Sequence, residues 1–572
     1  MAVGERATVT TRTIPALLER ATSAGRTDPA YLVQVEGGWQ PVAWDEVARR
    51  VDELAHGFLA LGLRKGDAFA ILGNTRLEWA LVNFALARIG AIVIPVYPTS
   101  SPADCAYVLG HSEAVGIICE DDEMRAPIEG IRGETQLEHL FTFADLDDIA
   151  ERGRQHAAAQ PDAVDEIAAA IAEHDVLTIV YTSGTTGPPK GCVMLHKNYA
   201  SVVEALTEIQ LNLAGDLVLL FLPLAHTYAQ LVLYNGAGIG FTIAFAPDIQ
   251  RVAEAMQEVR PTAMPSVPRV YEKVHAAITA KFDEATGAQR KIVDWALRVG
   301  YRSAHLRQQG RSLPRGLAVQ RRVADKLVFS KVKQRLGGRL RAGVSGAAPI
   351  SVEILEFFLA MDVLVLEGYG LTESSSGCSV NREDDFRFGT VGRVLPNVAV
   401  RIADDGEILI RGDNVFAGYY KDDDATRQAI EEDGWLHTGD VGTLDDDGFL
   451  RITDRKKDII VTAGGKNVAP QNLENDLKRQ PGISQAVVVG DRRPYLVALL
   501  TVEPGVEDAQ ALAQRAVDEV NRERTRFEQI KKFAVLERDF SAEQEEITPT
   551  MKLRRKVIVQ HFADEIERLY SG

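Results

Sequence analysis

Apolar positions along the first 120 residues recur at alternating helical and strand-like spacings. Val47, Val51, Leu54, Phe58 and Leu61 lie three or four residues apart, which predicts a helix with one apolar face. A second helix is predicted near 77–84. Short continuous apolar runs predict buried strands at 68–72, 91–96 and 115–119. Alternation of this kind builds helix-flanked sheets, so the pattern predicts an α/β fold.

A long stretch without Asp, Glu, Lys or Arg runs from Leu217 to Pro247. Its length suggests a membrane helix. A proline (Pro223), three polar residues (His226, Gln230, Asn235) and several glycines interrupt the apolar run, however. We therefore interpret it as a buried strand–helix–strand passage of a globular enzyme.

Residues 121–175 are acidic, alanine-rich and helical in pattern, and Asp445–Gly448 has the composition of a hairpin turn. The charged segment Arg455–Asp458 precedes about a hundred residues of mixed strand and helix pattern, enough for a small domain. We predict a large N-terminal domain of helix-flanked mixed sheets, residues 1–454, and a small mobile α+β domain, residues 455–572.

The composition narrows the function classes. The formal net charge of −17 argues against a nucleic-acid binder, because phosphate contacts need a basic surface. The first residues lack an apolar segment of secretory length, so we expect a cytoplasmic protein. The cysteines are too few and too scattered for a disulfide framework or a zinc site: Cys105, Cys119, Cys192 and Cys378.

The sharpest chemical signal is YTSGTTGPPKG, Tyr181 to Gly191. It follows a strand-like run at 177–180 and precedes an amphipathic stretch that begins near Asn198. Its spacing differs from that of a P-loop NTPase, but backbone N–H groups, hydroxyls and a lysine suit phosphate oxygens. The alternative is an ordinary Gly/Pro turn between strand and helix. The candidate phosphate contacts are Thr182, Ser183, Gly184, Thr185, Thr186, Gly187 and Lys190.

This loop resembles the phosphate-binding signature of the adenylate-forming superfamily, which contains acyl-CoA synthetases, adenylation domains and luciferases. Other segments resemble the superfamily's motifs in the same order: LPLAHTYAQ (Leu222–Gln230), VSGAAPI (Val344–Ile350), EGYGLTESS (Glu367–Ser375), GWLHTGD (Gly434–Asp440), DRKKDIIVTAGGKNVAP (Asp454–Pro470) and TPTMKLRRK (Thr548–Lys556). GWLHTGD followed by LRITDRKKDII is similar to the long-chain fatty acyl-CoA synthetase branch. The resemblance implies the adenylate-forming enzyme fold.

The resemblance also implies roles around the nucleotide. Glu373 matches the family's magnesium ligand, and Thr372 matches a phosphate contact. Asp440 matches the carboxylate that accepts hydrogen bonds from the ribose hydroxyls, with Arg455 near it. Two segments match those on either side of the adenine ring: Gly368, Tyr369 and Gly370 on one side, and Ser345, Gly346 and Ala347 on the other. The plain alternatives are a solvated carboxylate for Glu373, core packing for Tyr369 and a turn at Asp440.

Further roles follow from the same resemblance. Lys552 matches the catalytic lysine of adenylation; the family's glycine before it is absent, which leaves Lys556 as a rival. Lys457 matches the hinge between the domains, and His226 matches a histidine on the acyl-substrate side. The alternatives are a solvated basic helix, an ordinary charged linker and a structural histidine. Rotation at the hinge would present the CoA-side residues Gly464, Gly465 and Lys466.

The acyl chain needs an apolar wall, for which Leu217–Pro247 is the candidate. Arg315–Arg341 is strongly basic, and 320–336 has helical apolar spacing. Such a helix can lie on anionic lipid. We therefore hold peripheral contact with the inner face of the membrane as a hypothesis, with an ordinary exposed helix as the alternative.

These observations predict a long-chain fatty acid–CoA ligase that uses ATP and Mg²⁺ to form acyl-AMP and then transfers the acyl group to CoA. The expected partners are the fatty acid, ATP and CoA, with no nucleic acid, in a monomer or homodimer. One alternative is a fatty acyl-AMP ligase that delivers to a carrier-protein thiol. The other is a catalytically silent lipid-binding homologue.

Overall fold

The computed structural model describes residues 12–182, 188–522, 524–541, 544–548 and 553–571. The predicted α/β alternation at the N-terminus is confirmed. Val47, Val51, Leu54 and Phe58 are buried, because they lie on the one face of their helix that packs on the core. The expected elements are α2 (Trp44–Ala60), β3 (Ala68–Leu72), α3 (Leu77–Arg88), β4 (Ile92–Val96) and β5 (Gly116–Cys119).

The first large sheet has seven strands in the order β18-β8-β7-β4-β3-β5-β6. Strands β3 to β7 run parallel, whereas β8 and β18 are antiparallel additions at one edge. The phosphate-loop candidate follows the C-terminal end of β7, the edge where open α/β sheets bind ligands. The other strands of this sheet are β6 (His139–Thr142), β7 (Val176–Thr182), β8 (Lys190–Leu195) and β18 (Gly418–Tyr419).

The second large sheet has nine strands in the order β15-β14-β13-β12-β11-β9-β10-β1-β2. Its parallel centre places the ends of β12 and β13 side by side, with Ser345 opposite Glu367. The strands are β1 (Tyr31–Val35), β2 (Gly38–Val42), β9 (Leu217–Leu220), β10 (Thr242–Phe245), β11 (Ala263–Ser266), β12 (Ala342–Ser345), β13 (Leu364–Tyr369), β14 (Ser379–Val380) and β15 (Arg393–Val394).

The uncharged stretch is a strand–helix–strand passage, as the sequence predicts: β9, α9 (Thr227–Ile239) and β10. Helix α9 packs against α3 of the first sheet, where the Tyr234 hydroxyl donates to Asn83 Oδ1 at 3.1 Å and the Tyr234 ring contacts Phe84. The stretch lacks charge because it lies in the core between the two large sheets. No helix among the described residues is long and apolar enough to span a bilayer.

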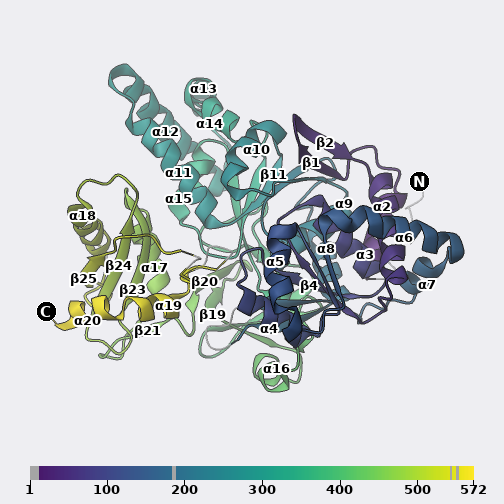
Figure 1. Cartoon of the computed structure of the whole chain (residues 1–572). Coiled ribbons are helices and arrows are strands. Elements are labelled where there is room, and N and C mark those ends of the chain that lie inside the picture. Colours follow the sequence, from purple (N-terminus) through teal and green to yellow (C-terminus); the bar gives the residue numbers. More distant parts are fainter. Residues whose placement is uncertain (1–11, 183–187, 523, 542–543, 549–552, 572) are drawn as a thin grey trace.

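Three smaller sheets follow among the described residues, in the orders β16-β17-β19-β20, β21-β22 and β23-β24-β25. The predicted hairpin turn at Asp445–Gly448 is confirmed, with the Gly448 N–H donating to Asp445 O at 2.9 Å. Figure 1 shows the last strands and helices set apart from the two large sheets, in green and yellow, and they enclose a core of their own. The 454/455 domain boundary stays a prediction. The strands are β16 (Val398–Ile402), β17 (Glu407–Gly412), β19 (Leu436–Leu444), β20 (Leu450–Arg455), β21 (Ile460–Val461), β22 (Asn467–Val468), β23 (Ile483–Val489), β24 (Leu496–Val502) and β25 (Ile530–Val535).

Two sequence interpretations are corrected. The phosphate loop joins two antiparallel strands, because β8 precedes the helix that begins at His196. Strand β6 lies within 121–175; its four residues are too few to show a period.

The helix predicted in the basic stretch is confirmed, with a π-helical segment at Asp325–Phe329 between two α-helices. The other helices are α1 (Ile14–Ser23), α4 (Pro102–Ser112), α5 (Asp122–Ile131), α6 (Leu146–Ala159), α7 (Ala163–Ala169), α8 (His196–Glu208), α10 (Val252–Val259), α11 (Pro268–Asp283), α12 (Gly287–Gln308), α13 (Arg315–Ala324), α14 (Ser330–Arg335), α15 (Val352–Ala360), α16 (Asp423–Ala429), α17 (Pro470–Lys478), α18 (Ala509–Arg522), α19 (Arg555–His561) and α20 (Ala563–Ser571).

Candidate active site

The C-terminal end of the phosphate loop lies beside a tyrosine, Tyr419, that the sequence analysis missed. Thr182 and Lys190 pair across β7 and β8. Lys190 Nζ lies 4.9 Å from the centre of the Tyr419 ring and 3.6 Å from Asp422 Oδ2. The lysine is therefore held at the base of the loop by a cation–π contact and an ion pair. The predicted contacts Ser183, Gly184, Thr185, Thr186 and Gly187 lie outside the described residues.

Glu373 lies in a 3₁₀ turn, Thr372–Ser374, and accepts a hydrogen bond from the Tyr419 hydroxyl at 2.9 Å. Burial and the nearby Glu373 carboxylate raise the pKa of Tyr419 far above its usual value, so the phenol remains a donor. No group of three metal-ligating side chains occurs in the described part of the chain. A single carboxylate nevertheless fits Mg²⁺, which takes one or two carboxylates together with phosphate oxygens and waters.

Tyr369 at the end of β13, Asp440 in the middle of β19 and Arg455 at the end of β20 lie together. The Tyr369 hydroxyl donates to Asp440 Oδ2 at 2.7 Å, and Arg455 Nε lies 3.3 Å from Asp440 Oδ1. Asp440 is buried, and these two partners fix the orientation of its carboxylate. Gly370 permits the sharp turn after β13, because a Cβ there would lie 2.2 Å from the carbonyl carbon of Ser376. Gly368 precedes Tyr369 in β13.

The loop after β12 is strained. Ser345 is buried, and its hydroxyl has no hydrogen-bond partner among the described residues. Ala347 has φ +70°, a left-handed conformation that costs a non-glycine residue energy and is typical of ligand-binding loops. A Cβ at Gly346 would lie 3.4 Å from the Tyr228 ring, so this loop packs on α9. A strained loop with an unpartnered hydroxyl fits a nucleotide contact.

Glu367 is a buried acid beside that loop, and the sequence analysis gave it no role. Burial raises its pKa to about 8, although N–H groups of Gly389 and Ile350 donate to the carboxyl group. Its Oε2 has no partner among the described residues. The Glu367 carboxyl group is therefore mostly protonated at neutral pH. Its hydrogen bond from the Ile350 N–H stabilises the segment that also contains Ser345.

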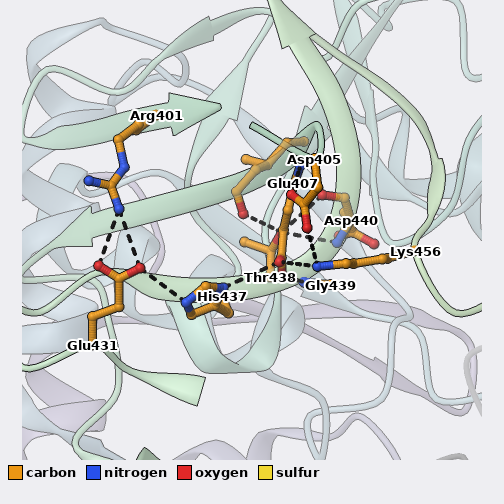
Figure 2. A network of polar contacts seen from close by, with 10 residues as sticks. Arg401, Asp405, Glu407, Glu431, His437, Thr438, Gly439, Asp440 and Lys456 are labelled. Carbon is orange, nitrogen blue, oxygen red and sulfur yellow. Dashed lines mark hydrogen bonds and ion pairs between the residues drawn. The ribbon is translucent and has the colours of Figure 1, made fainter. Parts of the chain in front are cut away.

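A network of polar contacts centred on Glu407 holds the peptide that precedes Asp440 (Figure 2). The Glu407 side chain is only 7% exposed. It accepts from the Gly439 N–H at 2.9 Å and from Lys456 Nζ at 2.9 Å, and it lies 3.2 Å from His437 Nδ1. Burial opposes its ionisation, but these donors prevail and lower its pKa. Glu407 thus ties the residue before Asp440 to the residue before Lys457.

Lys457 lies within electrostatic range of both carboxylates of the site, Asp440 and Glu373. Burial and then Arg455 lower its pKa, against the opposing attraction of Asp458, Asp440 and Glu373. Attraction from both Asp440 and Glu373 indicates that Lys457 faces the same centre as these carboxylates. The cluster therefore brings together carboxylates that could accept hydroxyl groups or hold a cation, and lysines that could neutralise an anion.

The predicted CoA-side turn lies apart from this cluster, and the predicted catalytic lysine lies outside the described residues. Gly464, Gly465 and Lys466 form an exposed turn between β21 and β22, where the Gly465 N–H donates to Thr462 O at 2.8 Å. Lys552 lies outside the described residues, whereas Lys556 is exposed in α19.

His226 is the N-cap residue of α9, and later residues of this helix line a small apolar cavity. Its Nδ1 accepts from the Tyr228 N–H at 3.1 Å and so caps the helix. The cavity encloses about 60 Å³, so a long acyl chain requires its walls to part. The lining supports the predicted acyl wall for residues of the 217–247 stretch and adds others: Leu206, Leu211, Asn212, Val218, Tyr228, Leu231, Val232, Asn235, Phe241, Ala263, Met264, Pro265 and Val344.

Comparison with known families matches both parts of the chain. The AMP-binding enzyme family matches residues 18–420, and the AMP-binding enzyme C-terminal domain matches residues 457–572. The chain belongs to the AMP-binding enzyme family. This places the chain among the adenylate-forming enzymes, which explains why its motifs converge on one cluster.

Relatives of this AMP-binding enzyme are similar over nearly its whole length. The long-chain-fatty-acid–CoA ligase FadD15 of Mycobacterium bovis is 37% identical, covering 96% of this chain and 95% of the relative. The human long-chain-fatty-acid–CoA ligase ACSBG2 is 30% identical, covering 98% and 93%. The anthranilate CoA ligase AuaEII, solved with anthranoyl-AMP, has a TM-score of 0.77 at 20% identity over 96% and 97% of the two chains. The last likeness concerns the fold alone.

Tyr419, Glu367 and Glu407 are the site residues that sequence reasoning missed. Tyr419 lies in Gly418-Tyr419-Tyr420 and Glu407 in an apolar strand, where neither pattern indicates a ligand. Glu367 opens a recognised motif, but only burial distinguishes it from a solvated carboxylate.

Proposed function

We propose that this AMP-binding enzyme is a long-chain fatty acid–CoA ligase. It activates a fatty acid with ATP, releases pyrophosphate and transfers the acyl group from AMP to CoA. The observation that carries this proposal is the similarity to long-chain-fatty-acid–CoA ligases over 96% of the chain, at 37% identity.

We propose the following roles for the described side chains. Asp440, held by Tyr369 and Arg455, accepts from the ribose hydroxyls, and the loop at Ser345 lies against the base. Glu373 would hold Mg²⁺, which neutralises phosphate charge. Lys190 and, from outside the described residues, Lys552 add positive charge where a carboxylate approaches a polyanion, since this reaction depends on positioning and charge neutralisation.

Release of AMP and pyrophosphate over a series of saturated fatty acids, with and without CoA, tests this function. We expect pyrophosphate release to depend on the fatty acid, and acyl-CoA to form only with CoA. Lys552→Ala should abolish acyl-AMP formation and largely spare thioester formation from supplied acyl-AMP. Accumulation of acyl-AMP that does not react with CoA would favour the acyl-AMP ligase alternative. Absence of adenylation with every fatty acid would favour the catalytically silent homologue.

We propose in addition that α13 and the π-helical turn after it contact anionic lipid. Val319, Val323 and Leu327 lie four residues apart and are 59%, 45% and 45% exposed. Exposed Arg322 and Lys326 flank them, and Figure 1 shows α13 at the periphery, away from the small domain. An exposed apolar stripe with cations beside it is suited to a membrane surface, where acyl substrates partition.

Vesicle flotation tests the lipid contact. The chain should bind vesicles that contain anionic lipid, and bind neutral vesicles less. Val319→Asp combined with Val323→Asp should abolish binding, whereas Val35→Asp, at a similarly exposed valine elsewhere, should not. Equal binding by all three proteins would overturn this proposal and leave the ligase activity untouched.

A further inference from the structure

Tyr419 contacts both the lysine at the end of the phosphate loop and the predicted magnesium ligand. Its hydroxyl donates to Glu373 Oε1 at 2.9 Å, and the centre of its ring lies 4.9 Å from Lys190 Nζ. One side chain therefore connects two segments of the site that are distant in the sequence. A phenylalanine would satisfy the ring contact alone, so the hydroxyl group serves the contact with Glu373.

Strand pairing fixes the position of Tyr419. It lies opposite Cys192 where β18 pairs with β8. Lys190 is the diagonal neighbour on the same face, because side chains alternate along a strand. The Tyr419 N–H donates to Thr426 Oγ1 at 2.8 Å, and the ring packs edge-on against Phe416, with the ring centres 4.9 Å apart. Both the backbone and the ring of Tyr419 are therefore held in place.

The segment that contains Tyr419 also holds Glu373. The Phe416 N–H donates to Glu373 O at 2.9 Å, and the Tyr419 hydroxyl binds one carboxylate oxygen. This hydrogen bond engages Oε1, so Oε2 is the oxygen available to a cation. Mg²⁺ demands near-octahedral geometry, which one oxygen of a carboxylate suits, whereas Ca²⁺ also accepts both oxygens of one carboxylate in a looser shell.

We propose that Tyr419 is a positioning residue that holds Glu373 as a one-oxygen ligand and thereby favours Mg²⁺ over Ca²⁺ when ATP binds. The same side chain keeps Lys190 at a fixed spacing from that ligand. Partners that hydrogen-bond a ligating carboxylate orient it and raise the affinity for the metal. This inference rests on the proposed function, because ATP is taken as the ligand, but it concerns only the metal dependence of ATP binding.

Equilibrium dialysis of the whole chain with ATP, without fatty acid or CoA, tests the proposal. The dissociation constant for ATP is measured with saturating Mg²⁺, with saturating Ca²⁺ and with EDTA. We expect the wild type to bind ATP more tightly with Mg²⁺ than with Ca²⁺. Tyr419→Phe keeps the ring beside Lys190 and removes the hydroxyl group. Its affinity for ATP with Mg²⁺ should fall about tenfold, its preference for Mg²⁺ over Ca²⁺ should shrink, and its affinity with EDTA should stay within about twofold.

Tyr420→Phe is the matched control. The hydroxyl group of this neighbouring tyrosine donates to Glu113 Oε2 at 3.3 Å, so its loss leaves the contact with Glu373 in place. Tyr420→Phe should bind ATP like the wild type under all three conditions. Affinity measured with EDTA also reports whether each variant is folded.

The outcomes separate this inference from the function on which it rests. Equal losses of affinity in Tyr419→Phe under all three conditions would assign Tyr419 a purely structural role and overturn the proposal. Wild-type affinity in Tyr419→Phe would overturn it as well, and so would a wild type that binds ATP equally well with Mg²⁺ and Ca²⁺. Absence of ATP binding by the wild type under every condition would overturn the proposed function itself.

Discussion

Asp440 depends on side chains that come from three other strands. Tyr369 and Arg455 contact its carboxylate directly, and Glu407 holds the peptide before it. A buried carboxylate that is oriented by several donors keeps its direction without reorganising when a ligand binds. At the scale of single residues, the site therefore depends on the side chains that position Asp440 as well as on Asp440 itself.

The first prediction concerns Glu407. Glu407→Ala leaves the Gly439 N–H and Lys456 without this acceptor, so Asp440 loses its fixed position. We expect the KM for ATP to rise about tenfold while kcat changes little. Glu407→Gln, which keeps an acceptor, should recover part of the loss in steady-state measurements.

Asp405→Asn is the matched control for Glu407. Asp405 also binds Lys456, at 2.5 Å, but the side chain is half-exposed and its backbone contacts do not include Gly439. We expect its KM for ATP to stay within about twofold of the wild-type value. A Glu407→Ala enzyme with unchanged KM would show that the network does not position Asp440.

The second prediction concerns the pH dependence of stability at Glu367. Its pKa is about 8 in the folded chain, against an ordinary value of 4.5. The folded state thus binds this proton more tightly than the unfolded state does. The contribution of Glu367 to the free energy of unfolding is therefore highest below about pH 4.5 and falls as pH rises through about 8. Glu367→Gln should remove this decline, which is on the order of a few kcal/mol.

Urea unfolding of Glu367→Gln and the wild type across pH 5 to 9 measures that difference. The two proteins should be similar near pH 5, and the variant should be more stable at pH 9. Glu407→Gln serves as a control, because the lowered pKa of this carboxyl group means that its stabilisation is lost only below about pH 4.5, so its difference from the wild type should stay constant over this range. Parallel curves for Glu367→Gln and the wild type would contradict a protonated Glu367.

At the scale of elements, α9 connects the nucleotide loop with the acyl cavity. Its first turn is capped by His226, Thr227 Oγ1 lies 2.6 Å from Ser376 Oγ, and later turns line the cavity. The start of this helix consequently sets where the cavity opens toward the site.

The third prediction separates capping from substrate contact at His226. His226→Ala should lower the free energy of unfolding by about 1 kcal/mol, whereas His226→Asn, with a good capping side chain, should retain it. If capping is the main role, adenylation by the Asn variant should stay within about threefold of wild type. Retained stability with an adenylation rate many times lower would instead assign His226 a contact with the acyl substrate.

At the scale of the whole molecule, the small domain rests on α11. Arg269 donates to Ser484 O at 3.2 Å and to Ser484 Oγ at 3.1 Å, and Lys478 Nζ lies 3.4 Å from Glu272 Oε1. The Arg269, Glu272 and Lys478 side chains are each 17% exposed, so these bonds are shielded from water. A few polar contacts of this kind can hold one orientation of the domain and still be exchanged for another.

The fourth prediction tests that interface. Arg269→Ala removes both bonds to Ser484, so the small domain should leave α11 more often. We expect amide exchange in the connector 456–459 to rise about tenfold, with little change in β23 and β24. Lys273→Ala, an exposed neighbour on the same helix, is the control and should change neither region. Unaltered exchange in Arg269→Ala would show that other contacts hold the domain.

Much of this architecture follows from local sequence. Helical periods, apolar runs and turn residues predicted α2, β3 and the Asp445–Gly448 hairpin, because each depends on neighbours within a few residues. Family motifs then indicated Tyr369, Glu373 and Asp440 as members of one site. Strand β8 escaped prediction because the preceding Gly/Pro loop obscured where the strand starts.

Only the tertiary structure decided which side chains meet. Tyr419 at Glu373 and Glu407 at Gly439 are contacts between segments distant in the sequence, and no local period encodes them. The same holds for the raised pKa of Glu367, because it results from exclusion of water by the packed core. The sequence by itself determined the fold class and the chemistry of the reaction. Packing determined how the site is held.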